Sequence, residues 1–256
     1  MTGPAPRVRI RFAKRGKVRF TSHRDLARIW ERALRRAEVP IAYTEGFSPR
    51  PKLSFGLALS TGHESEGEYL DVALRTEPGD DELAALPGRL APALPDGVEL
   101  QAAARLEPGA ESLQQAVTSC TWRIVIGDVS PPAVAAGVGR ALAAPALPLA
   151  RVRKGQQVND DVRPAILDVS VVGPVTGIAA PLAPVGSGTG TVVEAELATQ
   201  PRGLRPAEAI AAIDPSWVVA RVTRLHQWTQ AGSARREVTD LGPAATPPPH
   251  AEARAS

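Results

Sequence analysis

The chain has 256 residues, 43% of them hydrophobic, which is enough to fill the core of one large domain or of two small ones. Its single cysteine, Cys120, and four scattered histidines exclude a disulfide framework and match no zinc-ligand spacing, so we expect no metal and no cofactor. No apolar run approaches the roughly 18 residues of a membrane helix and no apolar signal core opens the chain, so we expect a soluble cytoplasmic protein.

The first hundred residues predict one compact unit. Residues 7–13, RVRIRFA, alternate between apolar and basic side chains, as in a half-buried strand. Residues 23–37 place apolar side chains along one helical stripe, and Pro40 prevents the helix from continuing. Strands are expected at 53–59, 69–74 and 98–103, with a helix at 80–90. This β-α-β-β-α-β order is that of a ferredoxin-like unit.

The same order recurs, less regularly, in the second half. Strands are expected at 120–126, 149–153, 166–172, 175–182, 192–197 and 217–228, with helices at 132–142 and 206–213. We therefore predict an α+β fold of two tandem ferredoxin-like (βαββαβ) domains with antiparallel sheets, at residues 7–104 and 118–230. A linker at 105–117 joins them, and disordered segments are expected at 1–6 and 231–256.

Charge is distributed unevenly along the chain. Residues 1–55 hold 14 basic and four acidic residues, a net charge of +10, whereas the remainder carries a net charge of −7. Six of the ten aromatic residues also lie in the first 55. Cations that bind phosphates, interleaved with aromatic rings that stack on bases, favour RNA as a partner, although a small domain also needs aromatic residues in its core. No motif that reads DNA sequence is present.

The first predicted helix carries several candidate binding residues. Ser22 and Asp25 fit a helix-capping pattern, and His23 beside them is a candidate base or stacking surface, or a structural residue. Four arginines on the outer side of the helix are candidate phosphate ligands, or else form a solvated face in which Glu31 pairs with one of them: Arg28, Arg32, Arg35 and Arg36.

Two loops supply the remaining candidates. In residues 46–56, GFSPRPKLSFG, two prolines stiffen a segment that presents basic and aromatic side chains, or else forms a rigid turn. Its candidates, with the residue that leads into it, are Tyr43, Phe47, Arg50 and Lys52. In the second half, Arg153 and Lys154 belong to a polar cluster at 151–164 that either extends a basic cleft or is internally paired.

The run SHRDLARIWERALRRAEVPIAYTEGFSPRPKLSFG, residues 22–56, resembles the signature of the radical-SAM-linked protein family, a domain of unknown function. The resemblance extends over residues 7–75 and, more weakly, over 118–228. It implies a stand-alone partner of a radical-SAM protein, because this chain lacks the CxxxCxxC motif of the radical-SAM enzyme itself. Relatives often carry His where this chain has Arg50, which argues against a paired-histidine site.

These observations favour a non-catalytic accessory module that binds tRNA or another structured RNA through an N-terminal basic face. Its expected partners are RNA and a radical-SAM protein or RNA-processing enzyme. One alternative is a protein-interaction scaffold for such a partner. Another is a metal-independent ribonuclease with His23 as general base. We assign no catalytic residue beyond that candidate and no metal ligand.

Overall fold

The computed structural model describes residues 5–153, 155–177, 188–231 and 234–238. The strands are β1 (Arg7–Lys14), β2 (Leu53–Phe55), β3 (Glu64–Ala73), β4 (Val98–Leu106), β5 (Val117–Gly127), β6 (Pro148–Arg153), β7 (Gln156–Asp161), β8 (Ile166–Thr176), β9 (Thr189–Ala198), β10 (Val218–Ala231) and β11 (Ala234–Glu237). The α-helices are α1 (His23–Arg36), α2 (Asp80–Leu90), α3 (Leu113–Ala116), α4 (Pro131–Ala143) and α5 (Pro206–Ile213). Short 3₁₀ helices lie at Gly16–Phe20 (η1), Ala91–Ala93 and Arg163–Ala165. None of the described helices is long and apolar enough to cross a membrane.

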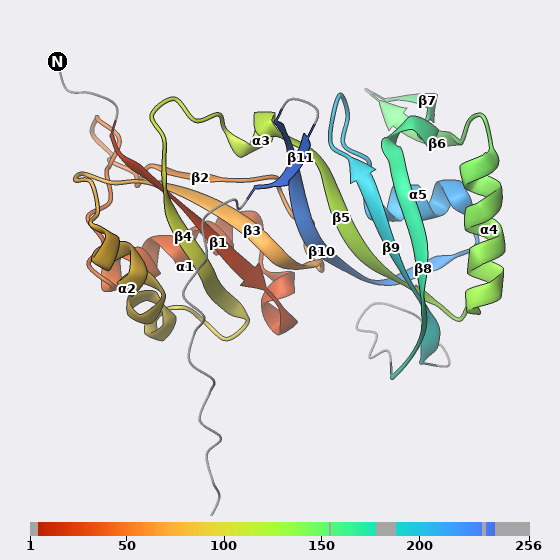
Figure 1. Ribbon diagram of the computed structural model, residues 1–256, viewed down its shortest axis with the longest axis horizontal. Helices are drawn as coiled ribbons and strands as arrows, with labels where there is room; N and C mark the ends of the chain where they lie inside the picture. The colour runs from red at the N-terminus through yellow and green to blue at the C-terminus, as the bar shows by residue number, and fades with distance from the viewer. Residues whose placement is uncertain (1–4, 154, 178–187, 232–233, 239–256) are drawn as a thin grey trace, which may run out of the picture.

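One mixed sheet of nine strands runs through the protein (Figure 1), in the order β4-β1-β3-β10-β5-β9-β8, with β2 added beside β3 and β11 beside β10. The predicted α+β class is confirmed, but a single mixed sheet replaces the antiparallel sheets expected for two domains. A short parallel pairing joins the halves, with Thr223 opposite Glu64 and Arg224 opposite Ser65. Because β2 pairs only with the later part of β3, the start of β3 would otherwise be an open edge, and β10 covers it.

The apolar side chains gather in two clusters, one in each half. In the first half, Phe12 of β1 packs edge-on against Trp30 of α1 with ring centroids 4.9 Å apart, and both side chains are fully buried. The alternate residues Val8 and Ile10 join the same cluster, as the period-two pattern predicts. In the second half, α4 packs on β8 and β9 and α5 on β6 and β10, and their buried side chains share one cluster with Ile124 of β5.

Several predicted boundaries were wrong, and the reasons lie in tertiary contacts. The strand predicted at 53–59 ends at Phe55, and β3 begins at Glu64 rather than 69 because β1 and β10 pair with its acidic first residues. The predicted linker contains the end of β4, helix α3 and the start of β5. The predicted disordered tail contains β11, which pairs with β10. Residues 178–182 of another predicted strand, residues 1–4 and residues 239–256 lie outside the described part of the chain.

Candidate functional site

Residues 41–52 form a narrow hairpin at one end of the sheet. Its base is fixed to β3, because Ile41 bridges to Leu74 and the Ala42 N–H donates to the Ala73 carbonyl (2.8 Å). Nearer the tip, the Thr44 N–H donates to the Arg50 carbonyl (2.9 Å) and the Arg50 N–H donates to Thr44 Oγ1 (3.0 Å). These bonds close the hairpin below its tip, residues 45–49, and the stiffness expected of the tip stays a prediction.

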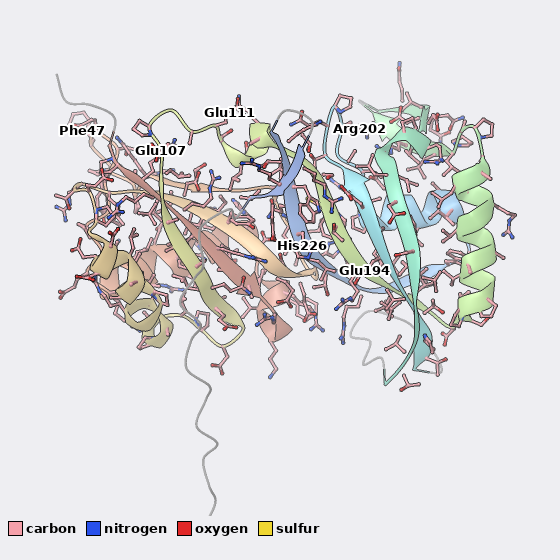
Figure 2. The ribbon with its side chains drawn as sticks, viewed as in Figure 1. Phe47, Glu107, Glu111, Glu194, Arg202 and His226 are labelled. Atoms are coloured by element: carbon pink, nitrogen blue, oxygen red, sulfur yellow. The ribbon has the colours of Figure 1, made fainter. Side chains whose placement is uncertain are left out.

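The tip of this hairpin exposes an aromatic ring. Phe47 is fully exposed, at 109% of its reference area, and Figure 2 shows it at the extreme end of the molecule. Gly46 before it has φ = +119°, a conformation that residues with a side chain rarely adopt. Tyr43, Arg50 and Lys52 are exposed on the same hairpin. An aromatic ring exposed on a surface loop is accessible to a ligand, and binding residues are often found on such loops.

The solvent-facing side of helix α1 carries a stripe of arginine side chains, opposite the buried side of the helix. Its buried side is formed by Leu26, Trp30, Ala33 and Leu34. At 3.6 residues per turn, five exposed arginines lie within roughly 120° of the helix circumference: Arg24, Arg28, Arg32, Arg35 and Arg36. Asp25 and Glu31 lie on or beside the stripe. Asp25 pairs with Arg28 at 3.2 Å, whereas no ion pair joins Glu31 to an arginine of the stripe among the described residues.

The residues at the start of α1 have mainly structural roles. Ser22 is the N-cap, and its hydroxyl accepts from the Asp25 N–H (3.2 Å) and donates to the Asp25 carboxylate (2.7 Å). This hydroxyl, with Arg28, holds the pKa of Asp25 below its ordinary value. His23 is exposed, and its imidazole lies edge-on to the Phe55 ring with the two ring centroids 5.1 Å apart. Among the described residues, no carboxylate orients this imidazole as a catalytic base would require.

Ion pairs and hydrogen bonds to carbonyl oxygens engage half of the basic residues in the N-terminal segment. Of the 14 basic residues in positions 1–55, seven are engaged by acidic side chains or carbonyl oxygens: Arg7, Arg9, Arg11, Lys14, Arg15, Arg19 and Arg28. Several of these partners lie far along the chain, so the negative remainder of the protein neutralises part of the positive segment. Within the described part of the chain, no ion pair engages the other seven: Lys17, Arg24, Arg32, Arg35, Arg36, Arg50 and Lys52.

Within the second polar cluster, Arg151 forms ion pairs. Arg151, whose side chain is 7% exposed, lies 3.1 Å from Glu208 and 3.7 Å from Asp160. Arg202 also pairs with Asp160. Of these partners only Asp160 belongs to residues 151–164, so Arg151 is neutralised partly from outside the cluster. Of the two candidates predicted here, Lys154 lies outside the described residues, and only the backbone of Arg153, at the end of β6, is described.

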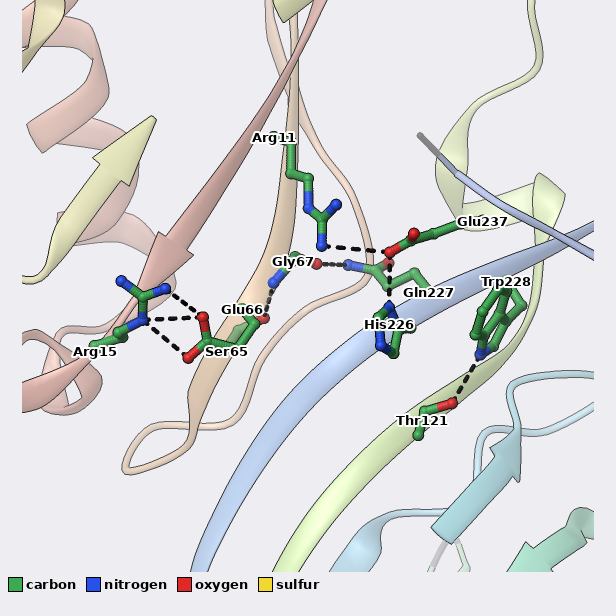
Figure 3. Close-up of polar contacts among 10 residues, drawn as sticks. All are labelled: Arg11, Arg15, Ser65, Glu66, Gly67, Thr121, His226, Gln227, Trp228 and Glu237. Atoms are coloured by element: carbon green, nitrogen blue, oxygen red, sulfur yellow. Dashed lines mark hydrogen bonds and ion pairs between the residues drawn. The ribbon is translucent and has the colours of Figure 1, made fainter. Parts of the chain in front are cut away.

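The structure also reveals polar residues at the junction of the halves that the sequence interpretation missed (Figure 3). Glu237 of β11 pairs with Arg11 of β1 at 3.3 Å and with His226 of β10 at 2.8 Å. The Gln227 side chain, which is fully buried, donates to the Gly67 carbonyl at 2.7 Å. Two of these contacts, Arg11–Glu237 and Gln227–Gly67, join residues more than 150 positions apart, so no local sequence pattern could have identified them.

Residues 7–204 match the family described as an uncharacterized protein conserved in bacteria, DUF2344. No curated protein matches the chain. Because the family match spans well over half of the sequence, the chain belongs to this family.

Proposed function

We propose that this member of the uncharacterized bacterial family is a non-catalytic accessory module that binds RNA. The observation that carries the proposal is Phe47, fully exposed at the tip of a hydrogen-bonded hairpin that also bears Arg50 and Lys52. Such a ring offers a stacking platform for an unpaired base, and stacking is tolerant of sequence because every base has a π-face. The neighbouring cations would contact the phosphates on either side.

The arginine stripe of α1 extends this interface. Arg32, Arg35 and Arg36 are exposed, and no carboxylate among the described residues neutralises them. Guanidinium groups bind phosphate oxygens in a bidentate manner, and their spacing along the helix suits a charged backbone better than a single anion. The interface proposed here therefore consists of the hairpin at residues 41–52 together with the outer face of α1.

The architecture proposed for this module is two ferredoxin-like units that share one sheet. In the first half the strand order is β4-β1-β3-β2, and in the second half it is β10-β5-β9-β8. Numbered within each half, both orders correspond to 4-1-3-2, with the β6–β7 hairpin inserted into the second unit. The likeness of residues 22–56 to radical-SAM-linked proteins supports the further proposal that the module serves a radical-SAM protein or an RNA-processing enzyme.

Fluorescence anisotropy of labelled tRNA and of a labelled single-stranded oligonucleotide tests RNA binding. If about five phosphates are neutralised, log affinity should fall with log salt at a slope of roughly 3.5 to 4.5. The variant Arg35→Glu/Arg36→Glu should weaken binding strongly. The matched variant Arg140→Glu/Arg221→Glu reverses two exposed arginines in the second half of the chain and should leave the affinity unchanged.

Other outcomes separate the alternatives. Absence of binding at low salt, or an equal effect of both double variants, would contradict the RNA interface. A stable complex with a protein partner and no RNA would instead favour the scaffold. RNA cleavage that is lost in His23→Ala would establish the ribonuclease, which the exposed and unoriented imidazole does not favour.

A further inference from the structure

A pocket of about 320 Å³ opens at the junction of the two halves, away from the hairpin. Its walls come from residues 57–63 after β2, from residues 199–206 before α5, and from strands β5, β9 and β10. Its size falls in the lower range of small-molecule sites. None of the residues assigned to the proposed RNA interface lines it, so a ligand bound there would be separate from that interface.

The charges buried beside this pocket do not balance. Arg224 is 1% exposed and lines the pocket, Lys14 is 2% exposed, and Glu68, at 7%, is the carboxylate near both. The other deeply buried charges among the described residues are paired elsewhere, Arg9 with Asp71 and the Arg151 side chain with Glu208. The cluster therefore carries a formal charge of +1, and a cation in a weakly polarisable interior is costly unless an anion compensates it.

Arg224 is held rigidly in place. Its two terminal nitrogens donate to the carbonyls of Leu57 and Ala58, both at 3.0 Å. The guanidinium lies over the Trp122 ring at 4.9 Å, and Nη1 is 3.4 Å from Glu68 Oε1, an ion-pair distance without a hydrogen bond. These contacts preorganise the positive charge, so no reorganisation is needed when a ligand binds.

Three of the eight buried side-chain polar atoms that lack a partner among the described residues lie at this cluster. Arg224 Nε and His63 Nδ1, both of residues that line the pocket, are buried and lack a hydrogen-bond partner in the described structure. Glu68 Oε1, behind the lining, also lacks one, but this carboxylate oxygen is an acceptor that an anion cannot satisfy. Buried polar groups are usually satisfied, and an unsatisfied set at one place indicates a missing water, ion or ligand. Apart from Arg224, the pocket wall is largely apolar, with Leu57, Leu59, Trp122 and Leu204, and the exposed Arg205 adds a second cation to the lining.

We propose that this pocket binds a small organic anion, with its phosphate or carboxylate group near Arg205 and Arg224 and its apolar body against Trp122 and the leucines. The two cations supply the attraction for the charged group, whereas the apolar walls select against inorganic ions, which leave that surface in contact with water. Occupancy compensates the buried positive charge, which links binding to the stability of the junction between the halves.

Isothermal titration calorimetry of the full chain at low ionic strength tests the proposal with four probes: phenyl phosphate, benzoate, benzyl alcohol and inorganic phosphate. Phenyl phosphate or benzoate should bind with 1:1 stoichiometry, and comparison of the two distinguishes a phosphate site from a carboxylate site. Benzyl alcohol, which keeps the ring and lacks the charge, and inorganic phosphate, which lacks the ring, should each bind at least tenfold more weakly. Equal binding of benzyl alcohol would refute the role of charge.

Two variants locate the bound anion. Arg205→Glu reverses an exposed pocket charge without disturbing the core and should weaken binding about tenfold. Arg221→Glu reverses an exposed charge on β10 outside the pocket lining and should have no comparable effect. An unchanged affinity in Arg205→Glu, or absence of binding by every anion, would overturn the proposal.

An NMR titration of His63 gives a second readout. Burial, followed by the charges of Arg224 and Lys14, lowers the pKa of His63 to about 4. An anion in the pocket should raise that pKa because it stabilises the imidazolium. Binding that leaves the His63 titration unchanged would place the ligand elsewhere. Failure of the RNA assay would not affect this result, since α1 and the hairpin do not line the pocket.

Discussion

Replacing Phe47 by alanine separates recognition from stability. The side chain is fully exposed, so its removal takes no apolar area out of the core, and the free energy of unfolding should change by less than about 0.5 kcal/mol. If Phe47 stacks on a base, the same change should cost about 1–3 kcal/mol of binding free energy, a loss of roughly 5- to 150-fold in affinity. A structural aromatic residue would show the opposite pattern, and Phe12→Ala, at a fully buried position, should cost about 3–5 kcal/mol of stability.

The assay pairs urea unfolding with anisotropy titrations of a single-stranded oligonucleotide. Leu167→Ala is the matched control, because Leu167 is an apolar residue on β8 that is 52% exposed and belongs to the other half. It should change neither quantity appreciably.

Two results would refute the reasoning. A loss of stability above about 1 kcal/mol in Phe47→Ala would mean that the ring packs against the protein. An unchanged affinity, in a protein whose binding is abolished by Arg35→Glu/Arg36→Glu, would mean that the interface holds phosphates and does not stack on bases.

Three further predictions concern the scaffold. Asp71 accepts two hydrogen bonds from the buried Arg9, at 2.7 and 2.8 Å, so Asp71→Ala leaves a buried charge unpaired and should destabilise the protein by about 3–5 kcal/mol in urea unfolding. Arg9→Met/Asp71→Leu removes both charges and should cost far less, and equal costs would contradict this account. The pKa of His63 is lowered to about 4 from an ordinary 6.5. The part of the free energy of unfolding that depends on neutral His63 should therefore be fully present above pH 6.5 and be lost as the pH falls from 6.5 to 4. His63→Gln should reduce this pH dependence by up to about 1.4 kcal/mol per pH unit, and an unchanged slope would show that His63 is not the titrating group. Gly97 has φ = +90°, and an added Cβ would collide with the backbone carbonyl at the start of η1, so Gly97→Ala should lower stability by about 1–3 kcal/mol. Gly88→Ala should not lower it, because the Cβ there meets open space, and thermal unfolding of both variants checks the difference.

Local patterns predicted much of the secondary structure. The alternation in residues 7–13 and the apolar stripe around Trp30 reflect which side chains are buried, and burial imposes a period of two on strands and 3.6 on helices. For the same reason the predicted helices at 80–90 and 206–213 coincide with α2 and α5. The Gly- and Pro-rich run around Phe47 likewise indicated a stiff loop, because glycine and proline restrict or permit backbone conformations locally.

The tertiary structure determines which aromatic and basic side chains are exposed and unpaired, and therefore available to a ligand. The sequence alone assigned six aromatic and 14 basic residues to the N-terminal segment, yet Trp30 and Phe12 are buried together while Phe47 is exposed. Arg9 and Arg11 are paired with Asp71 and Glu237, residues 62 and 226 positions away. Strand register, and the choice of which strand edges pair, determine three features of the fold. They are these ion pairs, the pairing of β3 with β10 that joins the halves into one sheet, and the pocket beside that junction. Periodicity along the chain records the burial of a side chain but not the identity of its distant neighbour, so these features arise only in the folded protein.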